Sequence, residues 1–244
     1  MGNLKSSNPA FNEKLLKGQY YASASDQATM SVAGAINKTG FLTLILVGSA
    51  AYAWNAASPL FLWVGIIGGL IAALVTIFKP SFSPVSAPLY AALEGLFIGT
   101  ISVTYSQLYS GIIPKAVLLT FAILMTMLVT YRLKIIRATA KFRAGIIMAT
   151  GGIFLFYCIT MLLRFFGVNT SMFFSGGMLG IGISLVIVVI ASLNLILDFD
   201  FIEQGAENAL PRYFEWYGAF GIMVTLVWLY MEILRLLSYF SGND

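Results

Sequence analysis

The sequence contains no histidine and only one cysteine among its 244 residues. Histidine is the side chain whose unperturbed pKa lies near neutrality, so its absence excludes imidazole catalysis, histidine-ligated metal sites and a simple imidazole pH switch. Because Cys158 has no second cysteine to pair with, an intramolecular disulfide scaffold is excluded as well. Any sensing of pH by this chain must therefore use carboxylates.

Charge is also scarce, since charged residues make up 10% of the sequence and apolar residues 59%. A typical soluble domain carries roughly 25% charged and about 45–50% apolar residues. So few charges cannot cover the surface of the chain, and most of that surface must contact lipid. The sequence also lacks motifs for phosphate binding, nucleophilic catalysis or metal clusters. We therefore expect no enzymatic activity, no cofactor and no nucleic-acid partner.

Long apolar runs are abundant and recur with short gaps. A helix needs about 20 predominantly apolar residues to cross the hydrocarbon core, and it satisfies its own backbone groups there. Seven runs reach this length, which predicts an all-α integral membrane protein built as a seven-helix transmembrane bundle. The predicted spans are residues 35–54, 60–78, 84–109, 113–131, 145–165, 176–197 and 212–239.

The domain organisation and orientation follow from the polar segments. Residues 1–32 are polar and lack the apolar core of a signal peptide, which predicts a cytoplasmic N-terminal tail before a transmembrane domain at 33–240 and a short C-terminal tail at 241–244. With the N-terminus inside, eleven of the fourteen basic residues lie on the inner side. Five of them lie in the loop Arg132–Arg143, which contains no acid and could contact anionic lipid headgroups.

Ionisable residues inside a membrane usually face protein, a partner or water, so each one is a candidate functional residue. Glu94 lies near the middle of the third predicted span and is the deepest charge in the sequence. Two roles stay open for Glu94. It is either a protonated residue hydrogen-bonded to a neighbouring helix or part of an ion or proton pathway.

An excess of acids follows the sixth predicted span. Asp198 and Asp200 lie at its inner end, and the stretch up to Glu215 holds five acids and one base. Two residues apart on a helix, Asp198 and Asp200 diverge by about 200°, so one can face the bundle and the other water. Such negative charge attracts cations, and oxygen ligands suit calcium, which predicts transient Ca²⁺ binding at the two aspartates. The alternative is a solvated acidic loop without function.

Two further groups of charges have predicted partners. Lys79 ends the second span on the same predicted side as the acids, and a salt bridge to Asp198 or Asp200 would form a latch that protonation of the carboxylate breaks. Glu232 and Arg235 are three residues apart on the last helix, so they share a face and can pair with each other. We interpret this second pair as structural.

Three segments of the C-terminal third resemble the Bax inhibitor / YccA-like family, and most closely its bacterial branch. They are Leu193–Glu203 (LNLILDFDFIE), Leu210–Gly221 (LPRYFEWYGAFG) and Leu226–Leu237 (LVWLYMEILRLL). The resemblance covers residues 33–240 and implies a seven-helix bundle in which the last helix is surrounded by the other six. It also implies a pH-sensitive calcium leak channel or a modulator of cell stress and membrane-protein turnover, located in a bacterial cytoplasmic membrane.

The resemblance further implies a pH sensor made of two aspartates, one on the sixth helix and one on the seventh. Asp198 matches the first aspartate, whereas Thr225 stands at the position of the second. The family's basic latch residue falls near Lys79. The acids that could replace the second aspartate are Glu94, Asp200 and Glu215.

The sequence therefore predicts a cation leak channel, with Ca²⁺ as the permeant ion, whose inner gate consists of carboxylates around Asp198. An alternative is a non-conducting regulator that binds membrane proteases or other membrane proteins through its helices and the basic loop. A proton-coupled transporter is a third hypothesis, but we see no inverted repeat that supports it. Membrane lipid and calcium ions are the expected partners.

Overall fold

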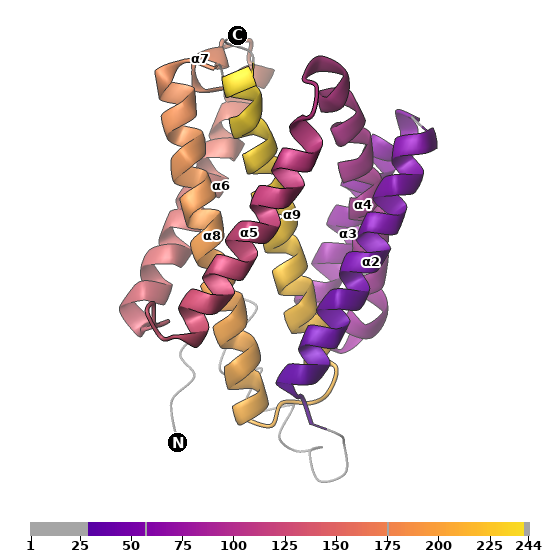
Figure 1. The fold of residues 1–244 in the computed structure, drawn as a ribbon, viewed down its shortest axis with the longest axis vertical. Coiled ribbons are helices and arrows are strands. Elements are labelled where there is room, and N and C mark those ends of the chain that lie inside the picture. The colour runs from indigo at the N-terminus through magenta and orange to yellow at the C-terminus, as the bar shows by residue number, and fades with distance from the viewer. Residues whose placement is uncertain (1–28, 57, 175, 242–244) are drawn as a thin grey trace. The chain divides into compact units, whose positions relative to one another are not determined.

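The computed structural model describes residues 29–56, 58–174 and 176–241 and is built of α-helices (Figure 1). Within these ranges, seven helices are long and apolar enough to cross a membrane, which confirms the predicted all-α membrane architecture. They are α2 (Val32–Ala56), α3 (Leu60–Phe78), α4 (Ser83–Leu108), α5 (Ile112–Arg132), α6 (Ala140–Phe165), α8 (Met178–Glu207) and α9 (Phe214–Ser241). The short helices η3 (Pro80–Phe82) and α7 (Ser171–Phe174) precede α4 and α8.

The helix ends agree with the predicted spans within a few residues, except in α6 and α8. α6 begins at Ala140 instead of 145, because the Thr139 side chain accepts a hydrogen bond from the backbone N–H of Phe142 and caps the helix. α8 continues to Glu207 instead of ending at 197, so the acids expected around the end of this span are on a helix. Hydropathy marks where a chain leaves the hydrocarbon, whereas a helix ends where its backbone hydrogen bonds stop.

Most of the predicted tails, residues 1–28 and 242–244, lies outside the described residues. The described end of the N-terminal tail is attached to the connection between α8 and α9. Thr29 and Pro211 form an isolated β-bridge, and the backbone N–H of Met30 donates to the carbonyl of Leu210 at 2.7 Å. The Met30 side chain is buried, so this end of the predicted tail is part of the folded domain.

The chain divides into two compact units. The first contains the described residues up to Val103 together with Asp198–Val224, and the second contains Thr104–Leu197 and the residues from Thr225 onward. The helices α4, α8 and α9 each contribute one part to each unit.

In the first unit, α4 packs closely against α2 and α3, which lie beside it in Figure 1. A Cβ atom on Gly99 of α4 would lie 2.9 Å from the Cα of Ala50 and 2.9 Å from the Cβ of Ala53, both on α2. A Cβ atom on Gly65 of α3 would lie 2.6 Å from the Cβ of Phe97 on α4. Glycine is therefore required at both contacts, because any side chain would separate the helix backbones.

The first unit also contains an antiparallel contact between α8 and α9. A Cβ atom on Gly218 would lie 2.8 Å from Cγ1 of Ile202, and one on Gly221 would lie 3.4 Å from Oδ1 of Asp198. The absence of side chains at these two glycines of α9 lets α8 approach closely. This approach brings the Asp198 carboxylate against the α9 backbone.

In the second unit, polar bonds join α6 to α8 and to α9. The amide of Asn194 on α8 donates to the hydroxyl of Thr150 on α6 at 2.9 Å. The hydroxyl of Tyr157 on α6 donates to the carboxylate of Glu232 on α9 at 2.7 Å. Polar bonds between helices of this kind hold transmembrane bundles together where there is no water to compete.

Burial and exposure fit a protein surrounded by lipid. Large apolar side chains point outward, including Phe78 at 80%, Phe165 at 84% and Met178 at 94% exposure. In contrast, 56% of the residues in the most apolar 18-residue stretch of α9 are buried, the largest fraction among the seven helices. This agrees with a last helix that is packed on several sides. Exposed apolar surface of this extent indicates an integral membrane protein.

Replacing Gly99 with alanine should destabilise the first unit. The added methyl group has no free space against the α2 backbone, and overpacking of this kind costs about 1–3 kcal/mol. The matched control is Gly48→Ala, because nothing lies within 4 Å of a Cβ at Gly48. Thermal unfolding in detergent should give a lower Tm for Gly99→Ala only. Equal Tm values for the two variants would show that α2 and α4 do not approach as described.

Candidate functional site

Glu215, in the first turn of α9, is the centre of a buried charge cluster in the first unit. The residue is 2% exposed. Its Oε1 accepts hydrogen bonds from the backbone N–H and the hydroxyl of Ser31, both at 2.9 Å. Its Oε2 forms an ion pair with the ammonium of Lys38 on α2 and lies 3.8 Å from Nε of Arg212. The buried carboxylate is therefore both paired and hydrogen-bonded, which offsets the loss of its hydration.

The local structure of α2 and α9 explains why this cluster forms. A carboxylate in the first turn of a helix is stabilised by the helix dipole and by N–H groups that lack partners in the helix. On α2, Gly34 leaves room for the Glu215 carboxylate, which would clash with any side chain there. Lys38 follows Gly34 by one helical turn, so both lie on the α2 face that meets α9. The Lys38 ammonium also lies 5.4 Å from the ring centroid of Trp216.

The two aspartates predicted as the sensor and calcium ligands have different neighbours. Asp198 is half-buried, and its carboxylate lies against the α9 backbone at Gly221. Asp200 is also half-buried, and its Oδ2 accepts a hydrogen bond from the side-chain amide of Gln204, one turn later on α8, at 2.8 Å. That one of the two side chains faces the bundle and the other water stays a prediction.

Glu94 and Lys79 lie elsewhere in the first unit. Oε2 of Glu94 would lie 2.6 Å from a Cβ atom on Gly69, so the carboxylate contacts the backbone of α3 directly. Lys79 is exposed at the end of α3, and its ammonium lies 4.2 Å from the ring centroid of Phe82. It forms no salt bridge with the residues that the structure describes. An ion pair that joins two helices in this unit, Lys38 with Glu215, uses another base.

The described residues contain no group of three or more acidic or cysteine side chains that could hold a metal ion. Asp198 and Asp200 by themselves are too few ligands for a resident calcium site. Transient calcium binding at the two aspartates stays a prediction.

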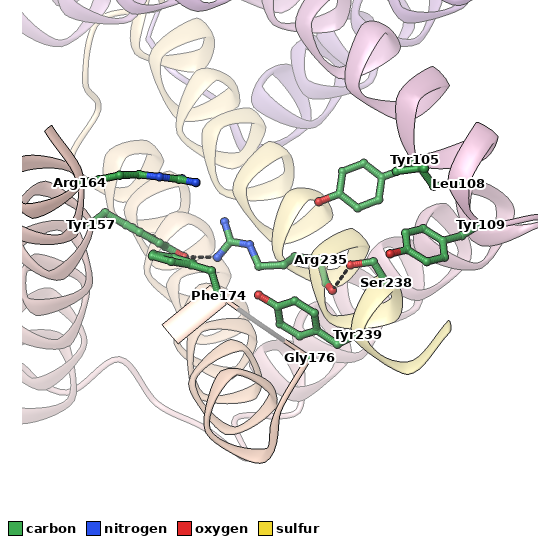
Figure 2. Close-up of a pocket in the computed structure, with 10 residues that line it drawn as sticks. All are labelled: Tyr105, Leu108, Tyr109, Tyr157, Arg164, Phe174, Gly176, Arg235, Ser238 and Tyr239. Carbon is green, nitrogen blue, oxygen red and sulfur yellow. Dashed lines mark hydrogen bonds between the residues drawn. The ribbon is translucent and has the colours of Figure 1, made fainter. Parts of the chain in front are cut away.

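The predicted pair of Glu232 and Arg235 is formed in the second unit and has a third member. Nη1 of Arg235 lies 3.2 Å from Oε2 of Glu232. The same nitrogen donates to the hydroxyl oxygen of Tyr157 at 2.7 Å, a bond that Figure 2 shows. Glu232, which is 2% exposed, also accepts hydrogen bonds from the Tyr157 hydroxyl and from the Trp228 side chain. Every bond of this network helps to keep a buried carboxylate within the membrane-spanning part of α9.

Sequence patterns do not identify the partners of the two buried acids. Lys38 is visible as a charge inside the first apolar run, and Glu215 as an acid at the start of the last one. However, 177 residues separate them, and no local periodicity links positions so far apart. Tyr157 resembles an ordinary aromatic residue of a membrane helix.

Comparison with known proteins agrees with the sequence resemblance. The family model described as "Bax inhibitor 1 like" matches residues 8–242, a range that includes all seven long helices. No curated protein matches the chain.

Proposed function

From the premise that the chain belongs to the Bax inhibitor 1-like family, we propose that it is a pH-sensitive calcium leak channel gated by carboxylates near the start of α9. The observation that supports this proposal best is the buried ion pair between Glu215 and Lys38. This pair joins the first long helix to the last one. A bond between two helices that depends on one carboxylate charge is suited to act as a latch.

Protonation of Glu215 would remove the charge that holds the Lys38 ammonium. The Lys38 side chain is only 15% exposed, so leaving it charged without a partner is unfavourable. The other charged group that faces this carboxylate, Arg212, would then also lose its attraction. Because the ion pair with Lys38 and the hydrogen bonds from Ser31 favour the charged form of this carboxylate, we expect strong acidification, and not a small fall in pH, to loosen α2 from the start of α9 and to increase the leak.

Asp198 and Asp200 supply the oxygen atoms for the permeant ion in this proposal. Calcium binds carboxylate and carbonyl oxygens, and a conducting site must hold it weakly enough to release it. Two half-buried aspartates on α8, one of them against α9, would supply such oxygens. Their position in the same unit as the Glu215 latch would couple ion passage to that latch.

We also propose that the chain resides in a bacterial cytoplasmic membrane with its N-terminus inside. Seven spans and this orientation would place the bases of Arg132–Arg143 on the cytoplasmic side. The Glu215 latch would then face the cytoplasm.

The channel proposal can be tested with purified protein in liposomes loaded with a calcium-sensitive dye. Asp198→Asn should lower the calcium leak several-fold, because the variant loses a charged oxygen ligand. The control is Glu207→Gln, which changes an exposed acid on the same helix. Leakage equal to that of empty vesicles would end the channel proposal, and an unaltered pH response in Asp198→Asn would exclude that residue as a sensor.

The basic loop favours the second candidate function, a non-conducting regulator that binds membrane proteases or other membrane proteins. Leu133 and Ile135 in this loop are 66% and 70% exposed between basic residues, as expected for a docking segment. Copurification from native membranes distinguishes the two functions. A stoichiometric membrane-protein partner together with no calcium flux would favour the regulator.

A further inference from the structure

A cavity of about 680 Å³ opens in the second unit beside the C-terminal part of α9 (Figure 2). The charged side chains that line it are Arg164 of α6 and Arg235 of α9. No acid lines it among the residues that the structure describes. The cavity is also separate from the proposed latch, because none of its lining residues belongs to the first unit.

Both arginines retain unused hydrogen-bond donors. Arg164 is exposed and forms no salt bridge with any described residue. Arg235 uses Nη1 for both of its bonds, to Glu232 and Tyr157, and its other N–H groups have no partner in the described part of the chain. Because Glu232 compensates only one of the two positive charges, the cavity carries a net positive charge.

Phenol groups add further donors to the same space. Figure 2 shows the hydroxyl groups of Tyr105 and Tyr239 directed toward the guanidinium of Arg235, with Arg164 extending toward it from the other side. No hydrogen bond joins these two hydroxyls to another residue that the structure describes. A ligand with several acceptor oxygens would therefore find guanidinium and hydroxyl donors on α4, α6 and α9.

We propose that this cavity binds a phosphate-bearing anion. A carboxylate has two oxygens in one plane and matches one guanidinium, whereas a phosphate group has oxygens that point in several directions. It can accept hydrogen bonds from Arg164 and Arg235 at the same time and still bond a tyrosine hydroxyl. The phosphate could come from a lipid headgroup or from a free phosphate, since both present the same oxygens.

Titration calorimetry on the full-length protein in neutral detergent tests this proposal with three probes. The probes are inorganic phosphate, short-chain phosphatidylglycerol and, as the zwitterionic control, short-chain phosphatidylcholine. Arg164→Gln should weaken binding of the anionic probe about tenfold while leaving the fold intact, because Arg164 has no salt bridge to lose. The matched control is Lys115→Gln, which removes an exposed base of the same unit that does not line the cavity. Arg164→Lys should restore part of the affinity.

The outcomes separate the two sources of phosphate and can reject the site. Binding of phosphatidylglycerol alone, lost in Arg164→Gln, would support a lipid headgroup site. Arg164-dependent binding of inorganic phosphate would support a site for a free phosphate. Absence of binding by both anionic probes, or equal affinity in wild type, Arg164→Gln and Lys115→Gln, would overturn the proposal.

Discussion

Replacing Glu215 with glutamine is expected to raise the calcium leak about tenfold or more and to abolish its increase at acidic pH. Glutamine keeps the size of the side chain and an oxygen that can accept the bonds from Ser31, but it cannot form an ion pair with Lys38. A hydrogen bond to a charged group contributes about 1.5–3 kcal/mol, and about 1.4 kcal/mol changes an equilibrium tenfold. The initial rate of dye response in calcium-loaded liposomes measures the effect.

Two comparisons make the Glu215 experiment specific. Lys38→Met should produce the same leak, and the double variant Glu215→Gln/Lys38→Met should not leak more than either single one, because all three break one bond. Glu207→Gln serves as the control, since this exposed acid lies in the same unit but outside the ion pair. If Glu215→Gln is folded and leaks no faster than wild type, the latch is not the gate.

Replacing Arg235 with methionine is expected to cost about 3 kcal/mol of stability, at the lower end of the range for breaking a buried ion pair. The substitution leaves Glu232 in a position that is 2% exposed and without a positive partner. The hydrogen bond from Tyr157 remains and limits the loss. The large drop in Tm can be followed by the fluorescence of the four tryptophans.

The double variant Glu232→Gln/Arg235→Met tests the cause of this instability. If the unpaired carboxylate is responsible, removing its charge should recover much of the lost Tm. Lys115→Met is the control, because it removes an exposed base of the same unit. A double variant that is as unstable as Arg235→Met alone would mean that the arginine acts through packing instead of charge.

The position of the helices was largely predictable, and α3 and α8 show both the strength and the limit of hydropathy. Both ends of α3, Leu60–Phe78, match the predicted span, because Pro59 precedes the helix and Lys79-Pro80 follows it. The predicted end of α8 at residue 197 coincides with the first acid, but the helix runs to Glu207. Acids and amides are tolerated in a helix that has left the hydrocarbon. The end of an apolar run therefore does not mark the end of the helix.

The candidate site was predictable only in part. Glu94 and Glu215 are recognisable as candidates because acids are rare in apolar runs, and Asp198 and Asp200 because they directly follow one. Their partners are not recognisable in this way. Lys79, the base that the sequence predicts as the partner of Asp198 or Asp200, lies over an aromatic ring. Lys38 forms the ion pair with Glu215.

Hydropathy summed over about twenty residues is a local property, so the order of residues was enough to predict the membrane class and the seven spans. The C-terminal motifs were enough to predict the family. Which charges meet depends on how helices far apart in the chain pack and rotate against each other. The pairing of Lys38 with Glu215, and the bonds from Tyr157 to Glu232 and from Arg235 to Tyr157, become visible once the helices are packed. A buried charge is stable only when an opposite charge lies within a few ångströms of it. The distance between two charges on different helices is set by the folded structure.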